Sequence, residues 1–315
     1  MDYEEHGNET YYYDADTSPM RVFPSTAAKV ITMSIYIISF IVGIIGNGIV
    51  IWLAGFKWQR SITGLLFLHL AIADFILVMF LPIELSYLVN NYHWSFGLAM
   101  CKISSFAYHV GSLASVFFLT VISLYRYCYI YKQELCYKYK YRYRPYAITL
   151  IAALWTLAII LATTRTYSKT IQEIIDGIDC IDDFHRDIHT SVLLYRIVMS
   201  LFLIIGYIIP SIIILISYRI IIIGSNDINN SVVRKNRIRL LSILIIAFLI
   251  CWTPYNIIRF LRIIGQHYNS NEFSAGCNLI FVALTFLNSC FNPIIYSFIN
   301  LDLGYYERSL KSNSE

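Results

Sequence analysis

Long apolar runs, broken by short polar stretches, dominate the chain. A bilayer core about 30 Å thick needs roughly 20 apolar residues per helix. Seven runs meet this requirement, over residues 28–54, 62–89, 99–131, 146–164, 191–223, 237–264 and 276–299. The pattern predicts an all-α membrane protein, a seven-transmembrane helix bundle within residues 28–299. Residues 1–27 form an acidic tail before it. In the short tail after it, residues 300–315, aromatic and leucine positions predict a short amphipathic helix.

The composition agrees with burial in lipid. Of the 315 residues, 57% are hydrophobic and 14% are charged, and the mean hydropathy is +0.59. These values are typical of a membrane protein. An enzyme is disfavoured, because the sequence offers no nucleophile with a base, no metal cluster and no phosphate loop. A transporter is disfavoured because no internal repeat is visible.

The charges of the connecting loops predict the orientation. The first loop has Lys57 and Arg60, the second has five basic residues within 132–144, and the third has four within 234–239. Loops rich in lysine and arginine stay in the cytoplasm. The N-terminal tail and the loop after the fourth run are acidic, so we expect a multi-pass plasma membrane protein with its N-terminus outside.

The second cytoplasmic loop alternates tyrosine with lysine or arginine over residues 137–144. Such a strip could stack nucleic-acid bases. Between two membrane segments, contact with the bilayer explains it better, because lysine and arginine meet anionic lipid while tyrosine lies at headgroup depth. We therefore expect no nucleic-acid partner.

Asp74 lies in the middle of the second run, where a charged group is costly unless it has a partner or a function. Four polar residues are candidates to face it: Asn47, Ser115, Asn288 and Asn292. Oxygen ligands of this kind suit a hydrated sodium ion. The alternative is a closed polar network without an ion. Both interpretations stay open, and no other cofactor is expected.

Four prolines stand inside apolar runs, at Pro82, Pro210, Pro254 and Pro293. Each removes a backbone hydrogen bond and bends its helix. Trp252 lies just before Pro254, and Tyr296 lies about one turn after Pro293. An aromatic side chain beside a hinge suits a two-state packing switch.

Taken together, these markers resemble the rhodopsin-like G-protein-coupled receptor family. They occur in family order and cover nearly the whole chain: Gly46-Asn47, Leu70-Ala71-Ile72-Ala73-Asp74, Cys101, Arg126-Tyr127, Trp155, Pro210 with Tyr218, Cys251-Trp252-Thr253-Pro254-Tyr255 and Asn292-Pro293-Ile294-Ile295-Tyr296. Each motif alone is weak, whereas the complete set is specific.

The resemblance implies roles for individual residues. Arg126 is similar to the family arginine that meets the heterotrimeric G protein, and Tyr218 and Tyr296 are similar to its supports in the active state. Trp252 resembles the toggle beneath the ligand. The switch and coupling set as a whole is Tyr125, Arg126, Tyr127, Tyr218, Trp252, Pro254, Asn292, Pro293 and Tyr296. Cys101 and Cys180 resemble the family disulfide between the third helix and the second outer loop, which the oxidising outer face permits.

One position departs from the family pattern. The family places an acid before the arginine, but here Tyr125 precedes Arg126. A carboxylate there pairs with the arginine and favours the inactive state. Its replacement by Tyr125 predicts raised ligand-independent activity. The opposite hypothesis is a decoy or scavenger receptor that binds its ligand without G-protein coupling, and it stays open.

Two ligand classes are disfavoured. Retinal would need a lysine in residues 276–299, and an amine would need an aspartate in the helix below Cys101. Residues 91–97 and 99–104 instead resemble the chemoattractant subgroup, which includes chemerin-like and formyl-peptide receptors. Chemokine receptors usually pair a tail cysteine with one at the position of Cys277, and no cysteine precedes Cys101. The resemblance implies a peptide or small-protein ligand.

The outer tail places tyrosines beside acids, at Tyr3, Tyr11, Tyr12 and Tyr13. These tyrosines resemble the sulfated tails of receptors for basic proteins. An acidic rim raises the encounter rate of a basic ligand, whereas the alternative is a disordered, solvated tail. Asn8 begins an N-glycosylation motif.

Six residues in the outer half are candidates for the ligand pocket: Glu84, His109, Arg196, Tyr255, Arg259 and Arg262. Glu84 needs a cavity or a ligand to solvate it, and the arginines could clamp the opposite end of a peptide. The alternative for Arg196 and Arg262 is extension to the membrane interface.

The chain is rich in isoleucine, tyrosine, asparagine and lysine, which AT-rich codons encode. With the short tail and the altered arginine motif, this composition resembles receptor homologues captured by large DNA viruses, poxviruses in particular. A viral origin implies the membrane of an infected host cell.

Overall fold

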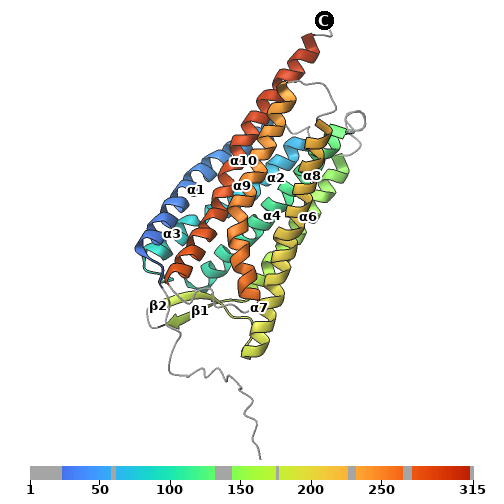
Figure 1. The fold of residues 1–315 in the computed structure, drawn as a ribbon. Coiled ribbons are helices and arrows are strands. Elements are labelled where there is room, and N and C mark those ends of the chain that lie inside the picture. The colour runs from blue at the N-terminus through green and yellow to red at the C-terminus, as the bar shows by residue number, and fades with distance from the viewer. Residues whose placement is uncertain are drawn as a thin grey trace, which may run out of the picture.

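The computed structural model describes residues 23–57, 62–131, 144–174, 177–225, 232–264 and 272–312. Within them, seven helical spans are long and apolar enough to cross a membrane: Thr26–Phe56, Gly64–Val89, Gly97–Arg126, Pro145–Tyr167, His189–Ile222, Ile245–Ile263 and Glu272–Pro293. The predicted seven-helix bundle is confirmed. A two-stranded hairpin lies at one end of the bundle and the C-terminus at the other (Figure 1).

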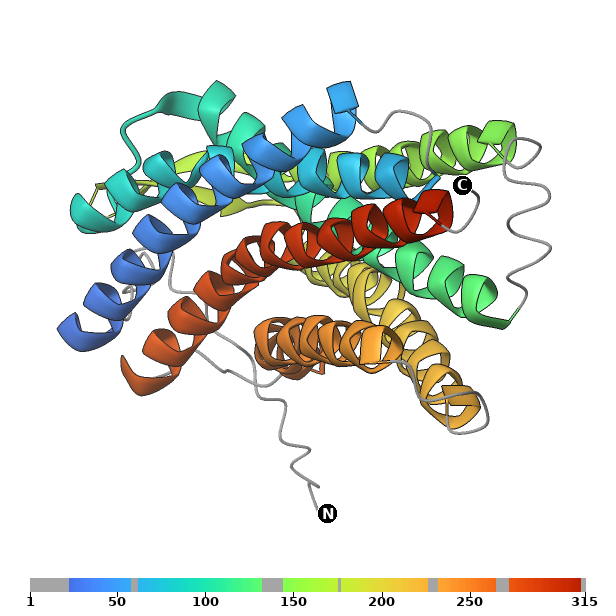
Figure 2. The ribbon, with the colours of Figure 1, turned by 90° about the horizontal axis from the view of Figure 1, so that it is seen from above.

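The elements follow one another in the order of the predicted runs. They are α1 (Thr26–Trp52) with a π-helical turn (Leu53–Lys57), α2 (Ile62–Met79), α3 (Leu81–Val89), α4 (Gly97–Tyr131), α6 (Arg144–Tyr167), β1 (Lys169–Ile174), β2 (Gly177–Asp182), α7 (Ile188–Leu203), a second π-helical turn (Ile204–Ile208), α8 (Ile209–Ser225), α9 (Val232–Ile263) and α10 (Glu272–Ser312). In the view from above, α1 (blue) and α10 (red) lie side by side (Figure 2).

Prolines explain most irregularities of the helices. Pro82 divides the second span into α2 and α3, with the break at Phe80. The π-helical turn Ile204–Ile208 comes just before Pro210 and joins α7 to α8. Pro254 and Pro293 lie inside α9 and α10. Each proline withholds one backbone donor; near Pro82 and Pro210 the helix breaks or rearranges, whereas α9 and α10 continue through Pro254 and Pro293.

Side chains cap the outer ends of two helices. Ser25 Oγ accepts a hydrogen bond from the backbone N–H of Ala28 at the start of α1. At the start of α7, Asp187 Oδ2 accepts from the backbone N–H of Thr190 at 2.8 Å and from its hydroxyl at 2.7 Å. These bonds from Thr190 lower the pKa of Asp187. Both caps satisfy N–H groups that lack a partner inside the helix.

The core lies between the helices, and the bundle turns apolar side chains outward as well. Leu70, Phe118 and Phe248 are almost fully buried, whereas Ile160 and Ile250 are 59% and 61% exposed. In water such exposure would be unfavourable, but lipid tails are as apolar as these side chains. The exposed residues therefore mark the lipid-facing surface.

Two features differ from the sequence prediction. The acidic loop after the fourth span folds into the antiparallel hairpin β1–β2, in which Ile171 lies opposite Cys180. The tail expected as a separate amphipathic helix instead continues α10 without a break to Ser312. No proline follows Pro293, so nothing in the sequence forces a break there.

Candidate functional site

A cavity of about 230 Å³ lies between the outer halves of the helices and under the hairpin. Its lining comes from α1, α2, α3, α4, α6, α9, α10 and both strands. Glu84 on α3 and Arg165 on α6 both line it, so the cavity has a carboxylate and a guanidinium group on its walls. A small concave site with a few polar groups among apolar ones is the usual form of a ligand pocket.

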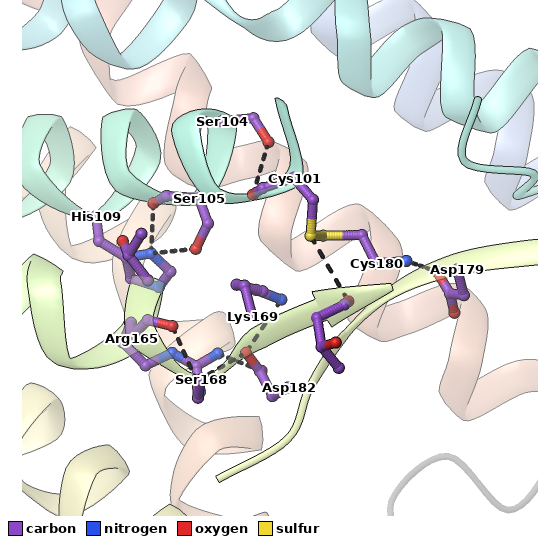
Figure 3. Close-up of polar contacts among 12 residues, drawn as sticks. Cys101, Ser104, Ser105, His109, Arg165, Ser168, Lys169, Asp179, Cys180 and Asp182 are labelled. Atoms are coloured by element: carbon purple, nitrogen blue, oxygen red, sulfur yellow. Dashed lines mark hydrogen bonds and ion pairs between the residues drawn. A yellow bond between two sulfur atoms is a disulfide. The ribbon is translucent and has the colours of Figure 1, made fainter. Parts of the chain in front are cut away.

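A disulfide ties the hairpin to the bundle over this cavity. Cys180 of β2 is bonded to Cys101 in the first turn of α4, with their Cα atoms 5.8 Å apart (Figure 3). Both residues line the cavity. The expected disulfide is confirmed, and it holds the hairpin over the outer side of the cavity.

Next to the disulfide, a cluster of charges fixes the end of the hairpin. Asp182 lies 2.6 Å from Arg165 Nη2 and 3.1 Å from Lys169 Nζ. Figure 3 shows the three side chains grouped beside the disulfide. Ser168 Oγ also donates to the Asp182 carboxylate at 3.4 Å. Burial works to raise the pKa of Asp182, but the charges of Lys169 and Arg165 outweigh it, so the pKa is lowered. The carboxylate therefore stays ionised.

Arg165 has more donors than this cluster uses. It is 8% exposed, and its Nε and Nη1 atoms are buried without a hydrogen-bond partner. Buried guanidinium donors without partners are costly. Because Arg165 lines the cavity, an anionic group entering there would meet them.

The cavity floor is made of aromatic and imidazole groups. His109 is 6% exposed, and its Nδ1 donates to the Ser105 carbonyl at 2.7 Å, which leaves Nε2 as an acceptor in the neutral ring. Tyr255 lines the cavity and accepts a hydrogen bond from Arg259 Nη2 at 2.9 Å. The guanidinium group of Arg259 also lies 4.6 Å from the centre of the Tyr255 ring. Arg259 itself does not reach the lining, so it acts on the cavity through Tyr255.

A second polar site surrounds Asp74, deeper in the bundle. Asp74 is fully buried, and its carboxylate accepts hydrogen bonds from Ser115 Oγ at 2.8 Å, Ser289 Oγ at 3.1 Å and Asn292 Nδ2 at 2.6 Å. Asn47 Nδ2 donates to the Ser289 carbonyl at 3.2 Å and so joins the network indirectly. The Oδ1 atoms of Asn47 and Asn292 are buried without a partner.

The residues around Asp74 fit a small hard cation, since a carboxylate, hydroxyls and amide oxygens are its preferred ligands. Of the four residues expected there, Ser115 and Asn292 bind the carboxylate. Asn288 is buried on α10, but within the described residues it makes no hydrogen bond to Asp74. Its neighbour Ser289 takes that place.

Comparison with known proteins decides the family. Residues 46–296 match the family described as 7 transmembrane receptor (rhodopsin family). This chain belongs to that family. Chemerin-like receptor 2 of Mus musculus is 35% identical over 95% of this chain and 85% of its own length. A G-protein coupled receptor homolog of fowlpox virus (strain NVSL) is 35% identical over 95% of this chain and 92% of its own length, and a second is 36% identical over 84% and 79%.

Membership of the rhodopsin family establishes the general class, location and partners of the protein. The chain is a receptor and not an enzyme, and it is a multi-pass protein of the plasma membrane. Its partners are an extracellular ligand and a G protein. Viral homologues are consistent with a host cell membrane.

The residues that the sequence predicts as a switch lie along α4, α8, α9 and α10. Trp252 is 5% exposed and packs near Phe248, at 6.3 Å between ring centres. The Tyr218 hydroxyl makes a short hydrogen bond with Ser242 Oγ and links α8 to α9. Pro293 lies so close to α1 that a Cβ on Gly46 would come within 2.9 Å of it.

Arg126 ends the membrane-spanning part of α4. Its guanidinium carbon lies 5.6 Å from the centre of the Phe67 ring, and Tyr125 packs against the main hydrophobic core. The side chains of Tyr127 and Tyr296 lie outside the described residues.

Three of the six candidate pocket residues do not line the cavity: Arg259, which contacts the lining residue Tyr255, and also Arg196 and Arg262. Arg196 is exposed on α7, and neither it nor Arg262 lines the cavity. The geometry of the cavity therefore gives no support to the expectation that Arg196 and Arg262 bind ligand there. The sites in the N-terminal tail, namely Asn8, Tyr3, Tyr11, Tyr12 and Tyr13, lie outside the described residues, as does the basic strip up to residue 143.

Sequence reasoning missed three charged residues at the receptor's outer end. Arg165 and Lys169 had no assigned role, and Asp182 was noted only as part of an acidic loop. The sequence does contain a sign that these residues meet. Arg165 comes directly after the fourth apolar run, and Cys180 stands two residues before Asp182. A disulfide at Cys180 brings Asp182 back towards the end of that helix.

Proposed function

We propose that this receptor responds to a peptide or small-protein chemoattractant whose end enters the cavity under the hairpin. The observation that carries the proposal is the charge arrangement of the cavity walls. Glu84 lies on α3, while Arg165 and Lys169 come from α6 and β1. A peptide end carrying a cation and a carboxylate would find a partner for each.

Similarity to relatives supports this ligand class. Chemerin-like receptor 2 of Mus musculus is 35% identical over most of the chain. Chemerin-like receptor 1 of Mus musculus is 30% identical. The acidic N-terminal tail supports a basic ligand, since opposite charges speed the encounter. Its tyrosines would add further negative charge if sulfated, and Asn8 would carry a glycan.

The test is ligand-stimulated nucleotide exchange in membranes from cells that express the receptor, with a panel of peptides and small basic proteins that includes chemerin. For a probe that activates the wild type, Glu84→Gln is expected to raise the half-maximal concentration at least about tenfold, the loss of one charged hydrogen bond. Glu272→Gln is the matched control, because Glu272 is an exposed acid at the outer end of α10. Equal potency of the two variants would remove Glu84 from the binding site.

The second part of the proposal is ligand-independent activity. Tyr125 brings no negative charge next to Arg126, and an inactive state held by such a charge is therefore weakened. Tyr125→Asp is expected to lower basal nucleotide exchange, whereas Tyr125→Phe, which also lacks charge, is expected to leave it unchanged. A basal level that is the same in all three proteins would contradict this part.

The two fowlpox virus relatives, and the many residues of the kinds that AT-rich codons encode, support a poxviral origin. The receptor would then lie in the membrane of an infected host cell and alter its response to chemoattractants.

A further inference from the structure

The loop between α3 and α4 holds the turn end of the hairpin through two hydrogen bonds to a single residue. The backbone N–H of Trp94 donates to the Ile178 carbonyl at 2.8 Å. The backbone N–H of Ile178 donates in turn to His93 Nδ1 at 3.2 Å. The turn end of the hairpin is thus attached to the bundle by a backbone bond and an imidazole at Ile178, and by a hydrogen bond from Tyr87 of α3 to Asp179 beside it.

The direction of the second bond fixes the protonation state of the imidazole. A backbone N–H can only donate, so His93 Nδ1 must accept and carries no proton. If the ring gains a proton, Nδ1 becomes a donor and two N–H groups face each other. Histidine is the side chain whose charge ordinarily changes between about pH 5 and 8. This bond can therefore exist in the neutral ring and not in the charged one.

Gly177 shows how closely the imidazole is seated against the strand. Its φ of +133° is a conformation that side chains rarely adopt, and a Cβ there would lie 2.4 Å from His93 Nδ1. Only glycine leaves room for the ring at this point. The contact between His93 and the hairpin thus depends on space and backbone shape as well as on the hydrogen bond.

Charged residues on the elements around His93 include Asp179, Lys29 and Glu173. Asp179 of β2 accepts from the Tyr87 hydroxyl at 2.6 Å and from a backbone N–H. Lys29 of α1 donates to Asn91 at 2.7 Å. Glu173 of β1 stands opposite Ile178 in the strand register.

We propose that His93 is an acid-sensitive latch on the hairpin that covers the cavity. The neutral ring accepts the Ile178 N–H, whereas the protonated ring loses this bond and leaves the turn end held only by the bonds from Trp94 and Tyr87. The other end is unaffected, because the Cys101–Cys180 disulfide and the ionised Asp182 do not change in this range. The consequence for binding rests on the proposed function: a ligand taken into an acidified compartment dissociates faster once the turn end loosens.

Hydrogen–deuterium exchange of the purified receptor in lipid nanodiscs, without any ligand, tests the latch. Exchange is compared at about pH 7.5 and about pH 5.5 after correction for intrinsic rates. In the wild type, protection over residues 177–179 is expected to fall roughly tenfold at the lower pH, the effect of losing about one hydrogen bond. Protection over 180–182 is expected to stay constant.

Two variants make the test specific. His93→Gln keeps an acceptor that does not titrate, and its hairpin is expected to show equal protection at both pH values. His185→Gln is the matched control, because His185 Nδ1 also accepts a backbone N–H, from Asp187 at 3.1 Å, but lies beyond the hairpin. It is expected to keep the wild-type response. Equal protection of the wild type at both pH values, or a pH response that persists in His93→Gln, would overturn the latch. Because no ligand is present, neither outcome bears on the ligand proposal.

Discussion

Asp182→Asn is expected to destabilise the outer end of the receptor through loss of a charge. The Asp182 carboxylate holds Arg165 at 2.6 Å and Lys169 at 3.1 Å. The asparagine side chain has almost the same size, so packing is kept and the negative charge alone is removed. Arg165 would then face a neutral group while its Nε and Nη1 atoms already have no partner.

The size of the effect follows from the exposure of the partners. Removing one member of a fully buried ion pair costs about 3–5 kcal/mol. The Arg165 side chain is 10% exposed and the Asp182 side chain 21%, so water screens part of the interaction and about 2 kcal/mol remains. For a protein of this size, 1 kcal/mol corresponds to roughly 2–4 °C in Tm, so the expected decrease is about 4–8 °C.

Thermal unfolding of the detergent-purified receptor, followed by accessibility of buried cysteines to a fluorescent thiol probe, measures this decrease. Asp183→Asn is the control, because Asp183 is exposed and makes none of these ion pairs. Its Tm is expected to lie within about 1 °C of the wild type. A Tm of Asp182→Asn equal to that of the control would refute the reasoning.

Three further outcomes are expected. The pKa of Asp182 is lowered in the folded state, so the stability that its charge contributes is complete above the unfolded pKa of about 3.9 and is lost only below it. The difference in Tm between the wild type and Asp182→Asn should therefore be equal at about pH 7.5 and about pH 5.5. Sodium chloride should raise the Tm more than potassium chloride in the wild type but not in Asp74→Asn, and equal salt effects in the wild type would favour the ion-free network. Tyr207→Phe should raise basal nucleotide exchange, because the Tyr207 hydroxyl is hydrogen-bonded to Thr253 Oγ1 at 2.6 Å beside the α9 hinge; unchanged exchange would show that this bond does not restrain the hinge.

The helices could be predicted from the sequence because lipid imposes a simple rule. Each span must satisfy its own backbone and present apolar side chains outward, so length and composition suffice to find it. Pro82 and Pro210 predicted irregular points of their helices for the same local reason. The hairpin could not be found in this way, since it is short and polar, and it is held by a disulfide to a distant part of the chain and by ion pairs at its open end.

The candidate sites could be predicted where an acidic side chain, whose burial in lipid is costly, stands inside an apolar run. Asp74 and Glu84 stand out in this way, and both lie at polar sites in the structure. Which of two adjacent residues contacts Asp74 was not predictable. Ser289, and not Asn288, binds the carboxylate, because a shift of one residue turns a side chain by about 100° around the helix. Arg165 was overlooked because an arginine at a helix end usually extends to the membrane surface.

The most direct test of signalling is basal nucleotide exchange on purified heterotrimeric G protein by the receptor in nanodiscs. The wild type is expected to exceed empty nanodiscs and to lose this activity in Arg126→Ala. Exchange by the wild type at the level of empty nanodiscs, with no increase for any probe that binds, would contradict the account and identify a receptor that captures ligand without coupling.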